Sequence, residues 1–457
     1  MAPFPENRKP LFFAGLITLL CAALLLVRSN SGSNNFVISG SFLVIIFYAA
    51  FETFRDTTPY SFNKMFWIFN LVFMGVVPLF QYTQHNMAWD EFFPDAIFIK
   101  TNLLLLVCLA AYSAIRTSLS KRPLKLKASP PVNGAQITPK AFLVGFCVFL
   151  ICCSGIIFTY GFSNIWHRQD AELSLYQNIH PTLALLLDKG LRGVTMYFSL
   201  LSIWLFRKKQ IALPWLLTVL FCCVFVNFPL SLARYYAACL YLSLLLAFHL
   251  KWLEKKNVFA ILLTVGLLIV FPALSLTRYA GEELTTHTKN LQSIYASALV
   301  KGDFDAYTSV CKTYQYIANH DITWGRQLLT VILFFVPRSI WPGKSIGSGA
   351  LIYEPSLENF HNYTSAYYAE GLINFGAIGA VLFIMGFAIA GCVYDRWYAR
   401  MKSSPALHFG VIFYPVAMIM SFFILRGDLL SSFAYLAGFF ISASLLHQFL
   451  RRLSKSA

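Results

Sequence analysis

Residues 371–393, GLINFGAIGAVLFIMGFAIAGCV, contain no charged side chain. A helix of about 20 apolar residues, rising 1.5 Å per residue, crosses the roughly 30 Å hydrocarbon core of a bilayer, so this stretch predicts a transmembrane helix. The whole chain has the same character. Of its 457 residues, 58% are hydrophobic and 12% are charged, whereas soluble proteins carry about 25% charged residues. This composition excludes a cytosolic enzyme, a secreted disulfide module and a disordered chain.

Twelve such apolar runs predict an all-α polytopic membrane protein. They lie near 10–28, 36–54, 65–82, 96–115, 141–160, 190–206, 210–228, 233–250, 257–277, 371–393, 407–425 and 428–449. If the N-terminus is cytoplasmic, most Lys and Arg fall in connections on the cytoplasmic side, as the positive-inside rule expects. Both termini are therefore predicted to be cytoplasmic. This orientation explains the net charge of +16, so no nucleic-acid partner is expected.

The chain is expected to divide into five parts. These are 1–115 with helices one to four, a basic cytoplasmic linker at 116–140, 141–277 with helices five to nine and a first periplasmic loop at 161–189, a large periplasmic region at 278–370, and 371–457 with the last three helices and a basic cytoplasmic tail. The apolar stretch QLLTVILFFV at 327–336 is too short to span a membrane. It predicts a re-entrant or interfacial helix within the periplasmic region.

Several cations oppose this orientation because they lie at or just beyond the predicted outer ends of helices. They are Arg168, Arg192, Arg234, Arg278, Arg338, Lys344 and Arg426. A structural ion pair or an interfacial side chain explains any single one of them, and Asp428 follows Arg426 closely. As a group they predict a site for a pyrophosphate or another polyanion, because planar guanidinium groups bind phosphate oxygens with two hydrogen bonds.

A polar and aromatic passage, NFHNYTSAYYAEG at 359–371, leads into the helix predicted at 371–393. Its tyrosines suit either an interfacial aromatic belt or a surface that binds sugar rings. His361 is the histidine of this passage. With a pKa near 6.5, a histidine is largely neutral at pH 7 and can accept a hydroxyl proton, although a lone His is more often structural.

Asp303 and Asp305 form an Asp-x-Asp pair, a pattern that can hold a divalent metal together with a nucleotide diphosphate. No third ligand is evident in the sequence, so neither a metal nor a cofactor is expected. Walker, Rossmann and HExxH patterns do not occur. Their absence argues against an ATP-driven pump, a dehydrogenase and a zinc protease.

Six stretches are distinctive as a set. They are YGFSNIWHR at 160–168, LSLARYYAACL at 230–240, LSLTRYAG at 274–281, FFVPRSIWPGK at 334–344, HNYTSAYYAEGLINFGAIG at 361–379 and LRGDLLSSF at 425–433. Together they resemble the Wzy-type O-antigen polymerases of bacterial surface-polysaccharide assembly. The PRSIWPGK element is the most specific of them. The stretch at 361–379 is similar to the His-Asn to Glu-Gly to Gly arrangement that these polymerases share with the O-antigen ligases.

The resemblance implies a GT-C-like, metal-independent glycosyltransferase at the periplasmic face of the bacterial inner membrane. Donor and acceptor would both be undecaprenyl-pyrophosphate-linked oligosaccharides, and membrane lipids and a chain-length regulator protein would be further partners. Arg234, Arg278 and Arg426 would hold the donor diphosphate and stabilise its charge as it leaves, while His361 would take the proton of the acceptor hydroxyl. Contacts to the substrates are expected from Arg168, Arg192, Arg338, Lys344, Asn362, Tyr367, Glu370 and Asp428.

Three other classes of protein stay open. An O-antigen ligase shares the His-Asn element and moves glycan from the same carrier to lipid A-core, and a non-catalytic scaffold would not require the Arg and His residues. A twelve-helix transporter or flippase fits the helix count. Transporters, however, concentrate charges and broken helices near the bilayer midplane and often show internal repeats. Here the charges lie at the outer ends, and the two halves show no repeat.

Overall fold

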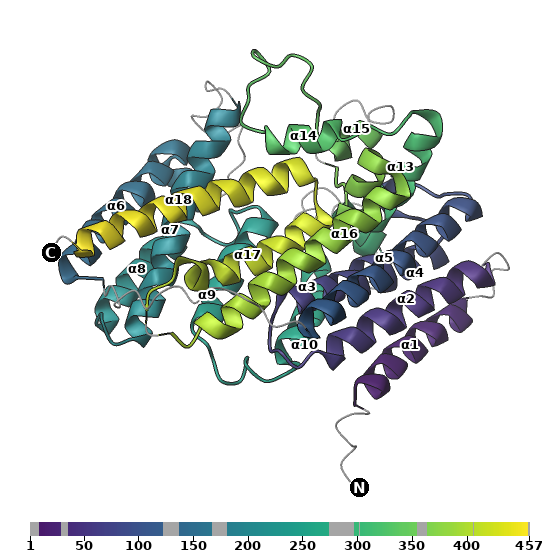
Figure 1. Ribbon diagram of the computed structural model, residues 1–457, viewed down its shortest axis with the longest axis horizontal. Coiled ribbons are helices and arrows are strands. Elements are labelled where there is room, and N and C mark those ends of the chain that lie inside the picture. The colour runs from purple at the N-terminus through teal and green to yellow at the C-terminus, as the bar shows by residue number, and fades with distance from the viewer. Residues whose placement is uncertain are drawn as a thin grey trace, which may run out of the picture.

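The computed structural model describes residues 9–28, 35–121, 137–166, 181–273, 297–300, 302–353, 363–404 and 406–455, and within these ranges the chain forms helices and no strand (Figure 1). The elements are α1 (Lys9–Arg28), α2 (Phe36–Arg55), α3 (Phe62–Phe69), η3 (Asn70–Val76), α4 (Val77–Thr83), η4 (Ala88–Asp90), α5 (Asp95–Lys121), α6 (Pro139–Tyr160), η5 (Phe162–Trp166), α7 (Pro181–Arg207), α8 (Leu213–Val226), α9 (Arg234–Ala247), α10 (Val258–Val265), η8 (Gly266–Val270), η9 (Gly302–Phe304), α13 (Ala306–Asn319), α14 (Arg326–Ile332), α15 (Ser348–Tyr353), α16 (Tyr367–Met401), α17 (Phe409–Arg426) and α18 (Leu429–Lys455).

Seven helical segments in the described ranges are long and apolar enough to cross a membrane. They are α2, the continuous segment Phe62–Thr83, α5, α6, α16, α17 and α18. Helices also occupy the described parts of the other predicted runs. However, α8 and α9 have 14 residues each, about 21 Å at 1.5 Å per residue, and α7 carries charges near its middle. The described part of the chain is therefore all-helical and compatible with a polytopic membrane protein, and the count of twelve spans stays a prediction.

Several helices begin where the sequence supplies a capping side chain. Asn35 accepts a hydrogen bond from the backbone N–H of Val37 before α2, and Ser61 accepts one from Lys64 before α3. Thr138 does the same for Ala141, and a proline follows it at the start of α6. An oxygen at the N-cap satisfies a backbone donor that has no partner within the helix, and proline fits the first helical position.

The described helices pack into two groups. In one, α1 and α2 pack together, and α5 lies along α16. In the other, α6, α7 and α18 pack together, with α9 against α17 (Figure 1). The helix α17 also contacts α3, which joins the two groups. The molecule is therefore one helical bundle in its described part.

The helix α16 is broken near its start. Phe375 and Gly376 leave helical geometry, and Gly376 has φ 69° and ψ −163°, a conformation open in practice only to glycine. A Cβ on Gly371 would lie 2.5 Å from the Cα of Ala380, so glycine is also required where the first turns pack against the later ones. The predicted single span at 371–393 is thus two helical pieces that meet at the Gly-rich stretch.

The break is supported by the residues around α14. The backbone N–H of Thr323 donates to the carbonyl of Ile373 (2.9 Å), and that of Leu328 donates to the side chain of Asn374 (3.2 Å). Polar groups left by an interrupted helix need such partners. The helix α14 has seven residues, so the stretch at 327–336 forms a short helix and not a span. Together α13, α14 and α15 lie at the end of the bundle where α16 begins, which we call the cap end (Figure 1).

The opposite end is held by a buried carboxylate on α16. Asp395 accepts hydrogen bonds from Arg116 (2.9 Å), from the backbone N–H of Phe62 (3.0 Å) and from the hydroxyl of Tyr414 (2.7 Å). Residue 116 was predicted to open the linker at 116–140, but α5 continues to Lys121. The N-terminal helices are therefore tied to α16 and do not form a separate unit.

Candidate functional site

Two of the predicted arginines meet at one short segment of the cap end. Arg426 is the last residue of α17, and Arg234 is the first residue of α9. Arg426 donates from Nε to the carbonyl of Asp303 (3.0 Å) and from Nη2 to the carbonyl of Gly302 (3.0 Å). Arg234 forms an ion pair with the carboxylate of Asp303. Residues 302–305, which we call the 302–305 segment, therefore bring together two arginines from different helices.

The 302–305 segment is fixed from its other side by Trp89 in η4. The indole Nε1 of Trp89 donates to Oδ2 of Asp305 (3.0 Å). A Cβ on Gly302 would lie only 2.1 Å from the Trp89 ring, so a glycine is needed for the ring to pack this closely. Asp305 also lies 3.5 Å from Nη2 of Arg426, and its side chain is fully buried. Burial raises the pKa of Asp305, and the positive charge of Arg426 opposes this rise.

The two arginines line a cavity of about 1670 Å³. Its polar end is formed by residues of the cap end, among them Trp89, Asp303, Tyr363 and Asp428. Its other walls are apolar and come from α9, α10, η8 and α17, and the lining follows α9 from Arg234 to Leu246. The cavity is therefore amphipathic, and it is larger than the pockets of about 300–1,000 Å³ that usually hold small molecules.

Aromatic rings form part of the wall near the arginines. The ring of Tyr235 stacks on Phe423 with 4.3 Å between centroids and on Tyr435 with 5.1 Å, and all three residues line the cavity. Tyr367, which the sequence suggested as a substrate contact, instead packs on Phe383 and Phe387 (5.3 and 5.9 Å). The aromatic part of the cavity wall thus comes from residues that sequence reasoning did not select.

A second carboxylate pair lies beside the cavity. Glu370 accepts hydrogen bonds from the hydroxyl of Ser348 (2.8 Å) and from the backbone N–H of Leu429 (3.1 Å), and it is 1% exposed. Asp428 accepts from the backbone N–H groups of Gly349 (3.0 Å) and Ser431 (3.2 Å). Asp428 lines the cavity, whereas Glu370 is not among its lining residues. Glu370 therefore holds the turn between α17 and α18 in place.

Asp428 is the acidic residue that this turn presents to the cavity. Burial raises its pKa, and the backbone hydrogen bonds that it accepts act in the opposite direction. A carboxyl group with a raised pKa can exchange a proton closer to neutral pH than an exposed one.

Arg192 lies in the middle of a buried network on α7. It donates to Asp188 (2.8 Å) and to the side chain of Asn227 (2.8 Å), and Lys189 also pairs with Asp188. The guanidinium lies over the ring of Tyr160, 5.2 Å from its centroid. Arg192 is 3% exposed and is not among the residues that line the cavity. Its partners are those of a structural ion pair.

The cations of the PRSIWPGK element hold their own loop together. Arg338 donates to the carbonyls of Lys344 (2.7 Å) and Ser345 (3.2 Å). Lys344 donates to the carbonyls of Phe334 (2.6 Å) and Val336 (2.9 Å). Neither side chain lines the cavity. In this conformation, the most specific motif of the sequence shapes the connection between α14 and α15.

The Asp-x-Asp pair does not point at one centre. Asp303 pairs with Arg234, and Asp305 bonds to Trp89 and approaches Arg426. Among the described residues, no group of three or more His, Cys, Asp or Glu side chains could hold a metal ion. In the structure, the carboxylates of this Asp-x-Asp pair supply the negative charge that faces the two arginines. The predicted residues Arg168, Arg278, His361 and Asn362 lie outside the described residues.

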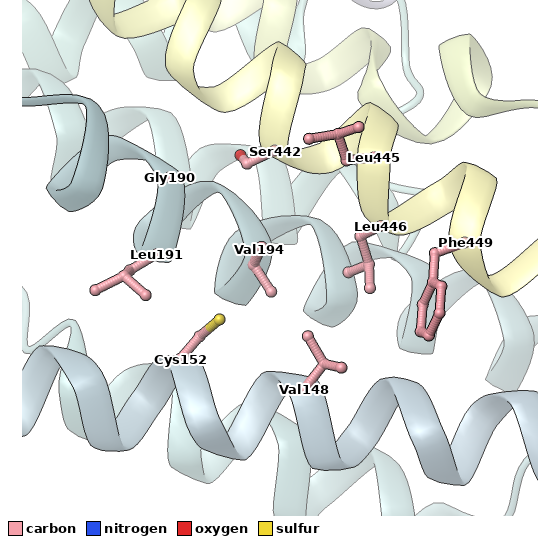
Figure 2. A pocket seen from close by; sticks show the side chains of 9 residues that line it. All are labelled: Val148, Cys152, Gly190, Leu191, Val194, Ser442, Leu445, Leu446 and Phe449. Atoms are coloured by element: carbon pink, nitrogen blue, oxygen red, sulfur yellow. The ribbon is translucent and has the colours of Figure 1, made fainter. Parts of the chain in front are cut away.

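A separate groove of about 330 Å³ lies between α6, α7 and α18 (Figure 2). Leu191 and Val194 face Val148 and Cys152 across it, and Leu445, Leu446 and Phe449 extend it along α18. The hydroxyl of Ser442 donates to the carbonyl of Gly438 (2.8 Å). The groove is therefore lined by apolar side chains apart from the Ser442 hydroxyl and the Cys152 thiol.

The chain matches no protein-family model, no curated protein and no solved structure.

Proposed function

We propose that this chain is a membrane glycosyltransferase that polymerises lipid-linked glycan. It would move the growing glycan from undecaprenyl pyrophosphate to a hydroxyl of a new lipid-linked repeat unit and form a glycosidic bond. One observation carries the proposal: Arg234 and Arg426 reach the polar end of a single large amphipathic cavity. The six sequence stretches that resemble the O-antigen polymerases supply the reaction class.

The shape of the cavity fits a substrate with an apolar tail and a charged head. Its apolar walls along α9, α10 and α17 can receive part of a polyprenyl chain. The guanidinium groups at its polar end suit the oxygens of a diphosphate, which planar forks bind with two hydrogen bonds. Tyr235 and Tyr435, whose rings stack on each other, line the cavity and give it an aromatic surface for the sugar next to the diphosphate.

The proposed roles follow from these positions. The acceptor hydroxyl attacks the anomeric carbon of the donor, the bond from that carbon to the diphosphate breaks, and the arginines hold the departing charge. His361 takes the hydroxyl proton, as the resemblance implies, and Arg278 is the third diphosphate ligand on the same ground. In the orientation predicted from the sequence, the cap end faces the periplasm of the bacterial inner membrane, and both termini face the cytoplasm.

The test is polymerisation by the purified full-length chain in nanodiscs with synthetic undecaprenyl-pyrophosphate repeat units. We expect a ladder of products on a gel, which Arg234→Ala and Arg426→Ala abolish. Arg207→Ala is the matched control, because Arg207 donates to the carbonyl of Ala247 at the opposite end of the bundle. EDTA in a parallel reaction tests metal independence.

Three results would overturn the proposal. Transfer of glycan to lipid A-core without polymer would indicate a ligase. Movement of the lipid-linked unit across a vesicle membrane without a new bond would indicate a transporter. A normal ladder from both Arg variants would separate the cavity from the reaction.

A further inference from the structure

Asp303 forms an ion pair with Arg234 at the place where the charged head of the proposed substrate would bind. We propose that Asp303 is a specificity-determining residue that keeps single-phosphate lipids away from Arg234 and gives way to a diphosphate. This inference rests on the proposed function for the identity of the ligand. The selection of a diphosphate over a single phosphate follows from the contacts that hold the 302–305 segment in place.

The side chain of Asp303 can move while its backbone stays in place. The carbonyls of Gly302 and Asp303 accept hydrogen bonds from Arg426, and Asp305 is anchored by Trp89. The carboxylate of Asp303 is 23% exposed and its partner Arg234 is 21% exposed, whereas the side chain of Asp305 is fully buried. The contact between Asp303 and Arg234 is therefore made by a partly exposed side chain, which can change its rotamer while the backbone of the segment is held by Arg426 and Trp89.

The tethered carboxylate competes with any incoming anion. Because it is attached to the chain, its effective concentration at Arg234 is on the order of millimolar or higher. A phosphodiester lipid carries one negative charge, so replacing the carboxylate with it exchanges one charge for one charge. A diphosphate carries at least two charges on linked phosphates, two in a diester and up to three in a monoester such as geranyl diphosphate, and it can reach Arg234 and Arg426 together, so the exchange gains an interaction.

The charges around the cavity favour such selection. Among the described residues, the charged side chains that line it are those of Asp90, Arg234, Asp303, Arg426 and Asp428. Within this described lining, three acids face two arginines, so these side chains do not by themselves form a general trap for anions. An apolar cavity with uncompensated arginines would collect the anionic lipids of a bacterial membrane. Asp303 is the acid that contacts an arginine directly by its side chain at the cavity wall.

The inference is tested by measuring the binding of geranyl diphosphate to the full-length chain in two kinds of nanodisc. One contains phosphatidylcholine alone, and the other contains one quarter phosphatidylglycerol. For the unaltered chain, we expect the phosphatidylglycerol to change the Kd little. Asp303→Asn should bind geranyl diphosphate about fivefold more tightly in phosphatidylcholine, the equivalent of a partly exposed ion pair. It should then lose most of this gain when phosphatidylglycerol is present. Asp303→Ser serves as a second variant and should behave in the same way.

Asp90→Asn is the matched control. Asp90 lines the same cavity and accepts a hydrogen bond from Asn86 (3.1 Å), so its loss removes the same charge without releasing Arg234. A gain in Asp90→Asn equal to that in Asp303→Asn would show a general charge effect and overturn the inference. Unchanged or weaker binding by both Asp303 variants would overturn it as well.

The assay measures binding and involves no glycosyl transfer, so failure of this inference can be distinguished from failure of the proposed function. Binding that depends on Arg234 but not on Asp303 would remove the selection and leave the proposed site. Absence of geranyl diphosphate binding in the unaltered chain and in both Asp303 variants would remove the diphosphate site, and the inference with it.

Discussion

Replacement of Arg426 by alanine should destabilise the folded chain strongly, whatever reaction it performs. The side chain is 19% exposed. It donates to the carbonyls of Gly302 and Asp303 (3.0 Å each) and lies 3.5 Å from the buried carboxylate of Asp305. Hydrogen bonds from a charged donor contribute about 1.5–3 kcal/mol each. Loss of one partner of a buried ion pair costs about 3–5 kcal/mol.

We expect a loss of about 3–4 kcal/mol for Arg426→Ala, because the contact to Asp305 is long and Trp89 still bonds that carboxylate. The assay is equilibrium unfolding of the purified chain in mixed micelles with increasing SDS. Arg338→Ala is the matched control. Arg338 also donates to two backbone carbonyls, but it is exposed and forms no ion pair with a carboxylate of the described residues, so its loss should cost less than about 1 kcal/mol.

A double-mutant cycle with Asp305→Asn isolates the charged contact. The amide oxygen of Asn can still accept from Trp89, so the single change removes mainly the charge that faces Arg426. The two substitutions should be less than additive by about 0.5–2 kcal/mol. Equal destabilisation by Arg426→Ala and Arg338→Ala would refute the argument that Arg426 organises the 302–305 segment.

Three further outcomes are expected. His361→Ala should keep geranyl diphosphate binding but lose about 10² to 10⁴ in polymerisation rate, and recovery of the rate in His361→Gln would indicate a hydrogen-bonding role instead of proton transfer. Gly376→Ala should cost about 1–3 kcal/mol in SDS unfolding because of its positive φ, whereas Gly386→Ala on the same helix, whose added Cβ meets nothing within 4 Å, should be neutral or stabilising. Burial raises the pKa of Asp305, so its contribution to stability falls as pH rises from the unfolded pKa through the folded pKa; Asp305→Asn should flatten the dependence of the unfolding midpoint on mildly acidic pH.

The positions of the helices could be predicted because hydrophobicity is a local property of the chain. Each predicted apolar run contains a helix in its described part, and the short stretch at 327–336 proved to be a short helix. Hydropathy does not report the break in α16, because Phe375 and Gly376 are as apolar as their neighbours. The signal that was present is the repeated glycine at 371, 376 and 379. It becomes interpretable only when the close contact to Ala380 is seen.

The candidate site could be predicted only in part, because its partners are distant in the sequence. Arg234 and Arg426 were selected for their position at helix ends, which is a local property. Their counter-charge lies 69 and 121 residues away, at Asp303 and Asp305. From the neighbouring sequence alone, the Asp-x-Asp pair could be interpreted only as a metal-binding pattern. Arg338 and Lys344 show the converse: they matched a specific motif, but their hydrogen bonds close their own loop.

The two arginines contact the same segment through different groups, and this difference separates their roles. Arg426 is bonded to backbone carbonyls, which cannot leave unless the segment unfolds. Arg234 is paired with the side chain of Asp303, which can leave by rotation about its own bonds. Arg426 therefore sets the geometry of the polar end, and in the proposed function Arg234 is the group that exchanges its partner for a ligand. Because the hydrogen bonds of Arg426 hold the segment in place, that exchange would leave the shape of the site unchanged.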